Sequence, residues 1–255
     1  METKKVGNTA NSGSDIPLVL YFHGNAGNLG DRIYHIKRLF KESRCHIFVL
    51  SYRGYGHSGG RASGRGLAID AKAALEFIQR NASELLYCHE ASATSPSTET
   101  SGVQVPVIVY GHSIGGAVGI HLASTDKSGA IIGLIVENTF TSLGDIVKFW
   151  YPRYTPYPFL TRFIRWPWHS EHQMASVTCP ILFMSGEKDE MIPAFMMHRL
   201  CAAATSANDK VFVSIPNGLH NDTWSRPGYW AGMGGFIKDI MVDTGKKYAH
   251  ERSKC

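Results

Sequence analysis

The sequence lacks the features that define several large classes of protein. Its five cysteines are scattered, odd in number and never form a C-x-x-C pair, which argues against a disulfide framework or zinc site and favours a reducing compartment. It has no apolar run long enough for a membrane-spanning helix. Residues 1–15 show no signal peptide. The chain has no run of Lys and Arg long enough to suggest nucleic-acid binding, so no nucleic-acid partner is predicted. No metal or cofactor is predicted.

What is present suits one large globular domain. The chain has 255 residues, of which 44% are hydrophobic, enough for a substantial core. The net charge of +5 is mildly basic. A mildly basic surface is compatible with peripheral contact with an anionic membrane. The predicted location is therefore either cytoplasmic or membrane-associated.

Short apolar runs alternate with segments of helical periodicity. The runs lack polar alternation, which is typical of strands buried on both faces, and cover residues 16–22, 45–52, 105–110, 130–136, 180–185 and 211–215. Helices are predicted over residues 31–42, 66–81, 193–204 and 228–243, the third with Pro193 as its first residue. The alternation predicts an α/β fold with a doubly wound, mostly parallel sheet.

Four segments depart from this alternation. Residues 1–15 are predicted to be disordered, residues 88–104 to form a Ser/Thr-rich surface loop, and residues 244–255 to form a polar tail after a domain spanning 16–243. Residues 139–178 are too long for a simple crossover and carry ten aromatic residues between Phe140 and Trp168. We interpret residues 139–178 as a lid; a second small core is the alternative.

The pattern G-x-S-x-G occurs twice, around Ser58 and around Ser113. A serine nucleophile needs a tight strand–turn–helix context that exposes its hydroxyl. Ser113 has this context, because the run 105–110 leads directly into it and a small, apolar helical segment follows. Ser58 is separated from its strand by "RGYG" and is followed by a flexible stretch. The sequence therefore predicts Ser113 as the nucleophile.

The partners of such a serine are expected in the order acid, then histidine. The turn after residues 180–185 carries Glu187, Asp189 and Glu190, and His220 follows the last predicted strand. Asp189 is preferred to Glu187 because it lies deeper in the turn. The predicted catalytic residues are thus Ser113, Asp189 and His220. The predicted oxyanion donors are the amides of Ile114 and, from the "HGNAGN" loop, Asn25.

At these residues the chain resembles the α/β-hydrolase superfamily, and within it the subgroup of α/β-hydrolase-domain-containing protein thirteen and its fungal BEM-type relatives. The motifs that carry the resemblance are "YFHGNAGNLGDR", "SYRGYGHSGG", "YGHSIGGAVGIHLAS", "VENTF", "FMSGEKDEMIP" and "GLHNDTW". Members of that subgroup usually carry a membrane anchor and two further strands before the "HGN" strand. Only 15 polar residues precede Ile16 here, so the N-terminal hairpin strands are not expected in this chain.

The resemblance implies a serine hydrolase with Ser113, Asp189 and His220 as its triad. The expected substrate is an acyl ester or thioester, and cleavage of palmitoyl-protein thioesters is transferred by analogy from related subgroups. Two alternatives remain: a non-enzymatic scaffold with the same fold, and a serine peptidase of this fold.

Overall fold

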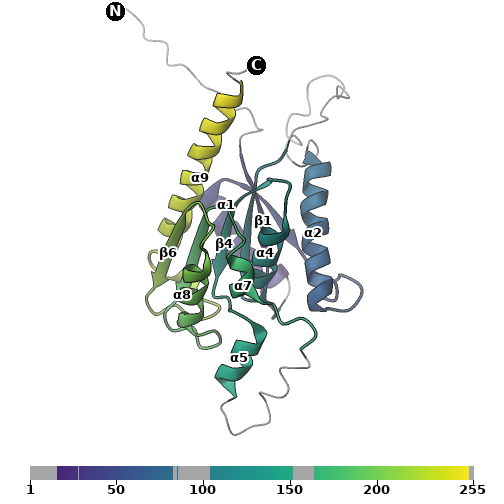
Figure 1. Ribbon diagram of the computed structural model, residues 1–255, viewed down its shortest axis with the longest axis vertical. Helices are drawn as coiled ribbons and strands as arrows, with labels where there is room; N and C mark the ends of the chain where they lie inside the picture. Colours follow the sequence, from purple (N-terminus) through teal and green to yellow (C-terminus); the bar gives the residue numbers. More distant parts are fainter. Residues whose placement is uncertain (1–15, 28, 83–84, 86–103, 152–163, 253–255) are drawn as a thin grey trace, which may run out of the picture.

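We describe the protein from a computed structural model (Figure 1). The structure describes residues 16–27, 29–82, 85, 104–151 and 164–252, with side chains up to Asp243. The predicted disordered segment 1–15 and nearly all of the predicted loop 88–104 lie outside the described residues. So do residues 152–163 of the predicted lid.

In the described part of the chain, six strands form one sheet in the order β2-β1-β3-β4-β5-β6, and each neighbouring pair is parallel. The strands are β1 (Leu18–Phe22), β2 (His46–Leu50), β3 (Val107–His112), β4 (Ile131–Glu137), β5 (Ile181–Gly186) and β6 (Lys210–Ile215). Each overlaps one predicted apolar run, with ends that differ by no more than two residues. The predicted parallel α/β sheet is confirmed.

Helices cover both faces of this sheet (Figure 1). They are α1 (Ile33–Ser43), α2 (Gly64–Arg80), α4 (Ile114–Thr125), α5 (Leu143–Trp150), α7 (Ser170–Met174), α8 (Ala194–Ala203) and α9 (Tyr229–Arg252). α1 and α9 pack on one face, against side chains such as Val19 and Ile108. α2, α4 and α8 pack on the other, against Leu20 and Val109. Neighbouring residues of one strand enter opposite cores because side chains alternate along it.

The four predicted helices are present, and their ends differ from the prediction by one or two residues except at the end of the last helix. The prediction ended the last helix at Asp243, whereas α9 runs to Arg252, so the predicted polar tail is helical over 244–252. The residues after Gly245 contain no proline and are mostly good helix formers, which allows the helix to continue past Asp243. Pro193 is the N-cap of α8, with ψ at 136°, and Ala194 is the first helical residue.

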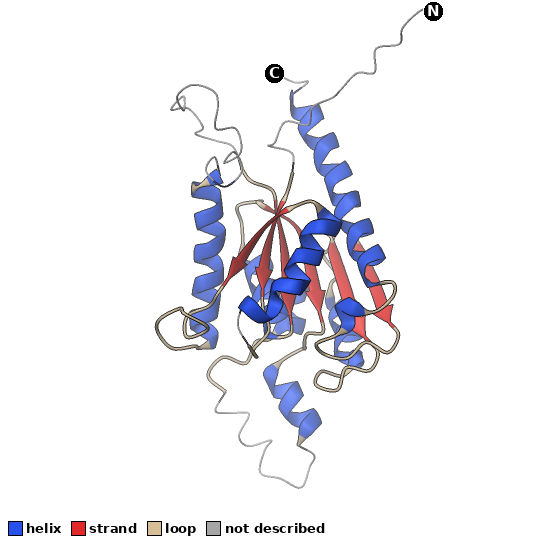
Figure 2. Cartoon of the chain, turned by 180° about the vertical axis from the view of Figure 1, so that it is seen from behind, coloured by secondary structure: helices blue, strands red, loops and turns tan. Residues whose placement is uncertain are grey.

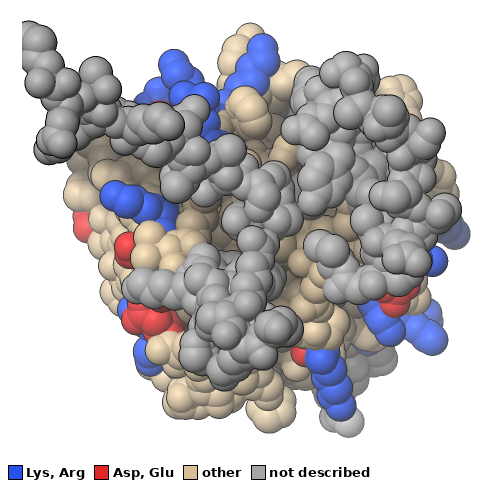
Figure 3. Space-filling model, turned by 90° about the horizontal axis from the view of Figure 1, so that it is seen from above, with Lys and Arg blue, Asp and Glu red and all other residues tan. Residues whose placement is uncertain are grey.

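The strands all point toward one end of the molecule. In Figure 2 their arrowheads face the end that carries α5, away from the two termini. Figure 3 shows the opposite end, where the visible Lys and Arg side chains are spread around the edge and Asp and Glu lie among them. In open parallel sheets, ligands bind outside the carboxyl ends of the strands. The end near α5 is therefore where a site is expected.

Candidate active site

Ser113 occupies the junction between β3 and α4. β3 ends at His112 and α4 begins at Ile114, so one residue makes the whole turn. Its φ is 57° and its ψ is −122°, a combination that L-residues with a side chain rarely adopt. Such backbone strain costs on the order of 1–3 kcal/mol and persists only where the surroundings enforce it. The turn lifts the Ser113 hydroxyl off the end of the sheet.

Two glycines let the turn close. A side chain at Gly111 would overlap the carbonyl oxygen of Gly115, and one at Gly115 would overlap the carbonyl oxygen of Phe22. The G-x-S-x-G spacing thus reflects close contact between β3, α4 and the end of β1. No such close backbone contact occurs at Gly60, the second glycine of the pattern around Ser58, where an added Cβ would lie 3.7 Å from the Arg53 Cβ, an ordinary van der Waals distance.

His220 lies between Ser113 and Asp189. Its Nε2 is 3.0 Å from the Ser113 hydroxyl oxygen, and its Nδ1 is 2.8 Å from Asp189 Oδ2. The carboxylate can only accept, so Nδ1 carries the hydrogen and Nε2 is free to accept from the serine. The side chains of His220 and Asp189 are 4% and 1% exposed. This arrangement can take a proton from a hydroxyl and stabilise the imidazolium that results.

The Asp189 carboxylate is held by its own turn. Its Oδ1 accepts the backbone N–H groups of Met191 at 2.8 Å and Ile192 at 2.7 Å, which leaves Oδ2 to His220. Glu187 instead accepts the hydroxyl of Ser214 at 2.8 Å. Glu190 accepts the backbone N–H of His220 at 3.0 Å and so contacts the histidine loop rather than the imidazole. Of the three acidic residues in this turn, Asp189 is the one whose carboxylate contacts the His220 imidazole.

Ser58 lies elsewhere and is otherwise engaged. It follows β2, which β1 separates from β3 in the sheet. Its hydroxyl donates to the carbonyl of Ser51 at 2.8 Å, and its carbonyl accepts the N–H of Gly54 at 3.2 Å. The structure does not bring Ser58 to the imidazole of His220.

The two predicted oxyanion donors, the backbone amides of Ile114 and Asn25, belong to two elements that meet beside Ser113. Ile114 is the first residue of α4, so its N–H has no acceptor within the helix. The loop after β1 runs alongside, because a Cβ on Gly24 would lie 3.4 Å from the Ser113 Cβ. Asn25 follows in that loop, and its side-chain Oδ1 accepts the Tyr55 hydroxyl at 2.6 Å. That bond anchors the loop that carries the Asn25 amide.

Sequence reasoning missed a buried polar cluster beneath the site. Glu137 at the end of β4 accepts hydroxyl hydrogen bonds from Tyr110, in a very short contact, and from Tyr229 at 2.9 Å. His35 Nε2 lies 3.2 Å from the Tyr110 hydroxyl. Glu137 is thus engaged away from the triad histidine. A lone glutamate ending the apolar run "AIIGLIV" was the only available signal, because its tyrosine partners come from β3 and α9.

Burial raises the pKa of Glu137 from 4.5 to about 6, although the two tyrosine hydrogen bonds and electrostatic interactions with His220 and Arg32 act in the opposite direction. Burial lowers the pKa of His35 to about 3, so this imidazole is neutral at physiological pH. A buried carboxyl with a raised pKa therefore lies at the end of β4, the strand beside the one that leads into Ser113.

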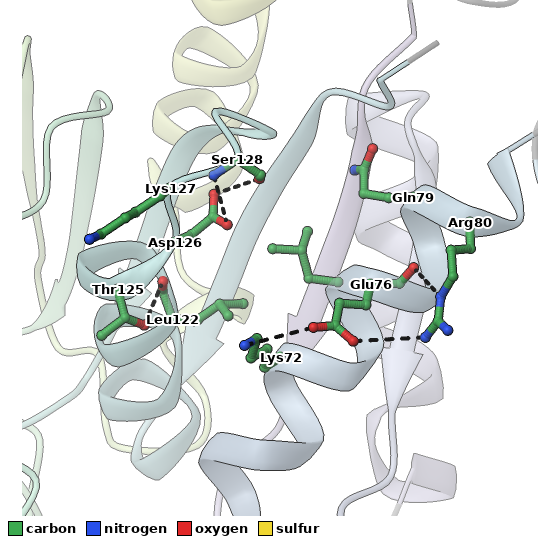
Figure 4. Close-up of a pocket in the computed structure, with 10 residues that line it drawn as sticks. Lys72, Glu76, Gln79, Arg80, Leu122, Thr125, Asp126, Lys127 and Ser128 are labelled. Carbon is green, nitrogen blue, oxygen red and sulfur yellow. Dashed lines mark hydrogen bonds and ion pairs between the residues drawn. The ribbon is translucent and has the colours of Figure 1, made fainter. Parts of the chain in front are cut away.

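A separate groove lies on the face of the sheet that α2 and α4 cover, near the end of α4 that is farther from Ser113. It holds about 710 Å³ between α2 and the C-terminal end of α4. Most of its charged side chains are paired, because Lys72 and Arg80 both pair with Glu76, and Asp126 accepts hydrogen bonds from Ser128 (Figure 4). The Thr125 hydroxyl donates to the carbonyl of His121. This groove includes none of the residues Ser113, His220 and Asp189 in its lining, so it is not the site described above.

Two features are absent from the part of the chain that the structure describes. There, no group of three or more His, Cys, Asp and Glu residues is arranged to hold a metal ion. Within the same residues, no helix has the length and apolar character needed to cross a bilayer.

The chain belongs to the alpha/beta hydrolase family, whose sequence profile matches residues 19–231. Protein bem46 of Schizosaccharomyces pombe is 36% identical over 231 residues, covering 89% of this chain and 69% of that protein. The alpha/beta hydrolase domain-containing protein WAV2 of Arabidopsis thaliana is 34% identical over 256 residues, covering 93% of this chain and 72% of that protein. The resemblance to this superfamily and to BEM-type proteins is confirmed.

Solved structures show the same fold. The Pyrococcus furiosus esterase Pf2001 superposes with a TM-score of 0.65 at 16% sequence identity, over 88% of this chain and 83% of that one. The predicted α/β-hydrolase fold is therefore confirmed.

The raised pKa of Glu137 predicts a specific pH dependence of stability. The folded state prefers the protonated carboxyl, so its contribution to the free energy of unfolding is complete below pH 4.5 and is lost as pH rises past about 6. The shift corresponds to a loss of about 2 kcal/mol. Urea unfolding on both sides of this window should show that loss in the parent chain relative to Glu137→Gln. Parallel pH dependence in the two proteins would contradict the prediction.

Proposed function

We propose that this chain is a serine hydrolase that cleaves esters or thioesters through an acyl-enzyme intermediate. The observation that carries the proposal is the continuous hydrogen-bonded chain from Ser113 through His220 to Asp189 at the strained β3–α4 turn. Membership of the alpha/beta hydrolase family and a fold shared with a solved esterase support the same class of reaction.

In the proposed mechanism, each of the three residues has a role in two half-reactions. In the first, Ser113 Oγ attacks the acyl carbon while His220 Nε2 takes the hydroxyl proton. The bond to the leaving oxygen or sulfur then breaks, and the leaving group receives that proton from His220. In the second, His220 takes a proton from water, the water oxygen attacks the acyl carbon, and Ser113 leaves with its proton restored. Asp189 keeps the imidazole in the required tautomer and stabilises its charged form.

The negative charge that forms on the acyl oxygen needs donors that are already in place. The amides of Ile114 and Asn25 are the proposed donors, one from the start of α4 and one from the loop after β1. The partial positive charge at the start of α4 adds to their effect. The two donors come from separate elements that approach each other at Gly24.

The finer proposal concerns the acyl group. α5 exposes Phe149 and Trp150 at the carboxyl end of the sheet, and the Phe149 ring lies 6.1 Å from that of Phe195 at the start of α8. The Trp150 indole donates to the carbonyl of Met191, in the turn that carries Asp189. Exposed aromatic residues beside a hydrolytic centre suit a long acyl chain. We therefore infer a lid over residues 139–178, a lipidic acyl substrate such as a palmitoyl-protein thioester, and peripheral contact with membranes.

Replacing Ser113 tests the reaction class. Ser113→Ala should lower kcat on a p-nitrophenyl ester by roughly 10⁴- to 10⁶-fold, because among the described residues no other hydroxyl is bonded to His220 Nε2. Ser58→Ala is the matched control and should keep most of the activity. Equal activity of Ser113→Ala and the parent chain would disprove the mechanism. A folded parent chain that hydrolyses no ester or thioester would favour the scaffold, and one that cleaves only peptides would favour the peptidase.

A series of acyl thioesters from acetyl to palmitoyl tests the proposed substrate. Each added CH₂ that is buried contributes about 0.8 kcal/mol, so kcat/KM should rise severalfold at most per carbon until the apolar surface is filled. Phe149→Ser should flatten this rise, whereas Ile69→Ser, which changes an equally exposed apolar side chain on α2, should not. A preference for acetyl thioesters that anionic liposomes do not alter would contradict the proposed lid and the proposed lipidic substrate. The proposed esterase activity would still stand.

A further inference from the structure

Asn138 is the first residue after β4, and it is almost completely buried, with 2% of its surface exposed. Its φ is 45°, in the left-handed region that asparagine tolerates better than other residues with a side chain. It belongs to the "VENTF" motif, whose role the triad does not explain. A buried polar side chain on a strained backbone calls for partners that hold it there.

One end of the Asn138 amide contacts the turn that carries the acid. Its Oδ1 accepts the backbone N–H of Gly186 at 2.8 Å. Gly186 ends β5, and Asp189 follows three residues later. Because only an oxygen can accept from this N–H, the contact also fixes the orientation of the amide and turns Nδ2 toward the histidine loop.

The other end of the amide contacts the loop that carries the base. Nδ2 donates to the backbone carbonyl of His220 at 3.1 Å and to the Thr223 hydroxyl at 2.8 Å. Thr223 in turn donates to the carbonyl of Leu219 at 2.6 Å. The backbone on both sides of the triad histidine is thus tied, directly or through Thr223, to one side chain.

The nucleophile turn joins the same network from two directions. The Ser113 N–H donates to the carbonyl of Glu137, the residue before Asn138, at 2.9 Å. His112 Nε2 lies 2.8 Å from the His220 carbonyl, which accepts this hydrogen bond together with the one from Asn138. Burial holds the pKa of His112 well below its ordinary value, so its ring is neutral and Nε2 carries a hydrogen.

We propose that Asn138 is a positioning residue for the hydrolytic reaction, whose side chain sets the distance between the His220 imidazole and its two triad partners. The inference rests on the proposed function, since it concerns the same site. Asn138 touches neither the reacting hydroxyl nor the imidazole, and acts through the His220 carbonyl and the Gly186 amide. A misplacement of about 1 Å in such a site costs about 100-fold in rate.

Two substitutions separate the role of the side chain from that of the backbone. Asn138→Gly keeps the left-handed conformation and removes every side-chain contact. Asn138→Asp keeps the shape and the acceptor for Gly186 but loses the amide donor to His220 and Thr223. Asn217→Gly is the matched control, because Asn217 also has a left-handed φ, of 58°, precedes His220 by three residues and is exposed.

The measurement is kcat and KM on a p-nitrophenyl ester, expressed per site titrated with a fluorophosphonate, together with the melting temperature. Asn138→Gly and Asn138→Asp should each lower kcat by roughly 10- to 100-fold with KM changed by less than about threefold, since the chemical step is affected and binding is not. Asn217→Gly should stay within about twofold of the parent chain in both constants.

The outcomes distinguish this inference from the proposed function. A parent chain that neither labels nor hydrolyses esters would end both. An active parent with kcat per titrated site unchanged in Asn138→Gly and Asn138→Asp would overturn only the positioning role. If those variants merely melt earlier while each titrated site turns over at the parent rate, Asn138 serves stability alone and the inference is also wrong.

Discussion

Ser113 is held in a backbone conformation that a residue with a side chain avoids, and the surrounding contacts enforce it. The Ser113 N–H donates to the carbonyl of Glu137, and the Thr139 hydroxyl donates to the carbonyl of Ser113 at 2.7 Å. Both contacts come from β4 and the residues just after it, so the strand beside β3 fixes the turn from one side. The close approach of Gly115 to the end of β1 fixes it from the other. The position of the hydroxyl follows from these constraints.

The same end of β4 links the site to the core. Glu137 points into the buried tyrosine cluster, whereas Asn138 points to the loops of Asp189 and His220. Glu137 is the last residue of β4 and Asn138 follows it in a left-handed conformation, so the end of one strand contacts both the core and the site. The cluster brings Tyr229 of α9 against β3 and β4, which ties the C-terminal helix to the strand before the nucleophile.

The fold and the three proposed catalytic residues could be predicted because each leaves a local signature. Strands buried on both faces appear as continuous apolar runs, and the nucleophile turn requires glycines at fixed positions. Asp189 and His220 could be found because parallel strands deliver the residues that follow them to one edge. The roles of Tyr110, Tyr229 and Asn138 could not be predicted, because their partners are distant in sequence and meet only in the folded chain. The end of α9 was missed because its last turns lack the apolar periodicity of a packed helix.

The central claim is that the folded chain activates one serine through one histidine. The most direct test is to treat the folded protein with a fluorophosphonate and to locate the adduct by peptide mass spectrometry. The account predicts one adduct per chain, on Ser113, and a strongly reduced labelling rate in His220→Ala, because the imidazole must take the hydroxyl proton. An adduct on Ser58, or labelling of Ser113 at the parent rate in His220→Ala, would contradict it.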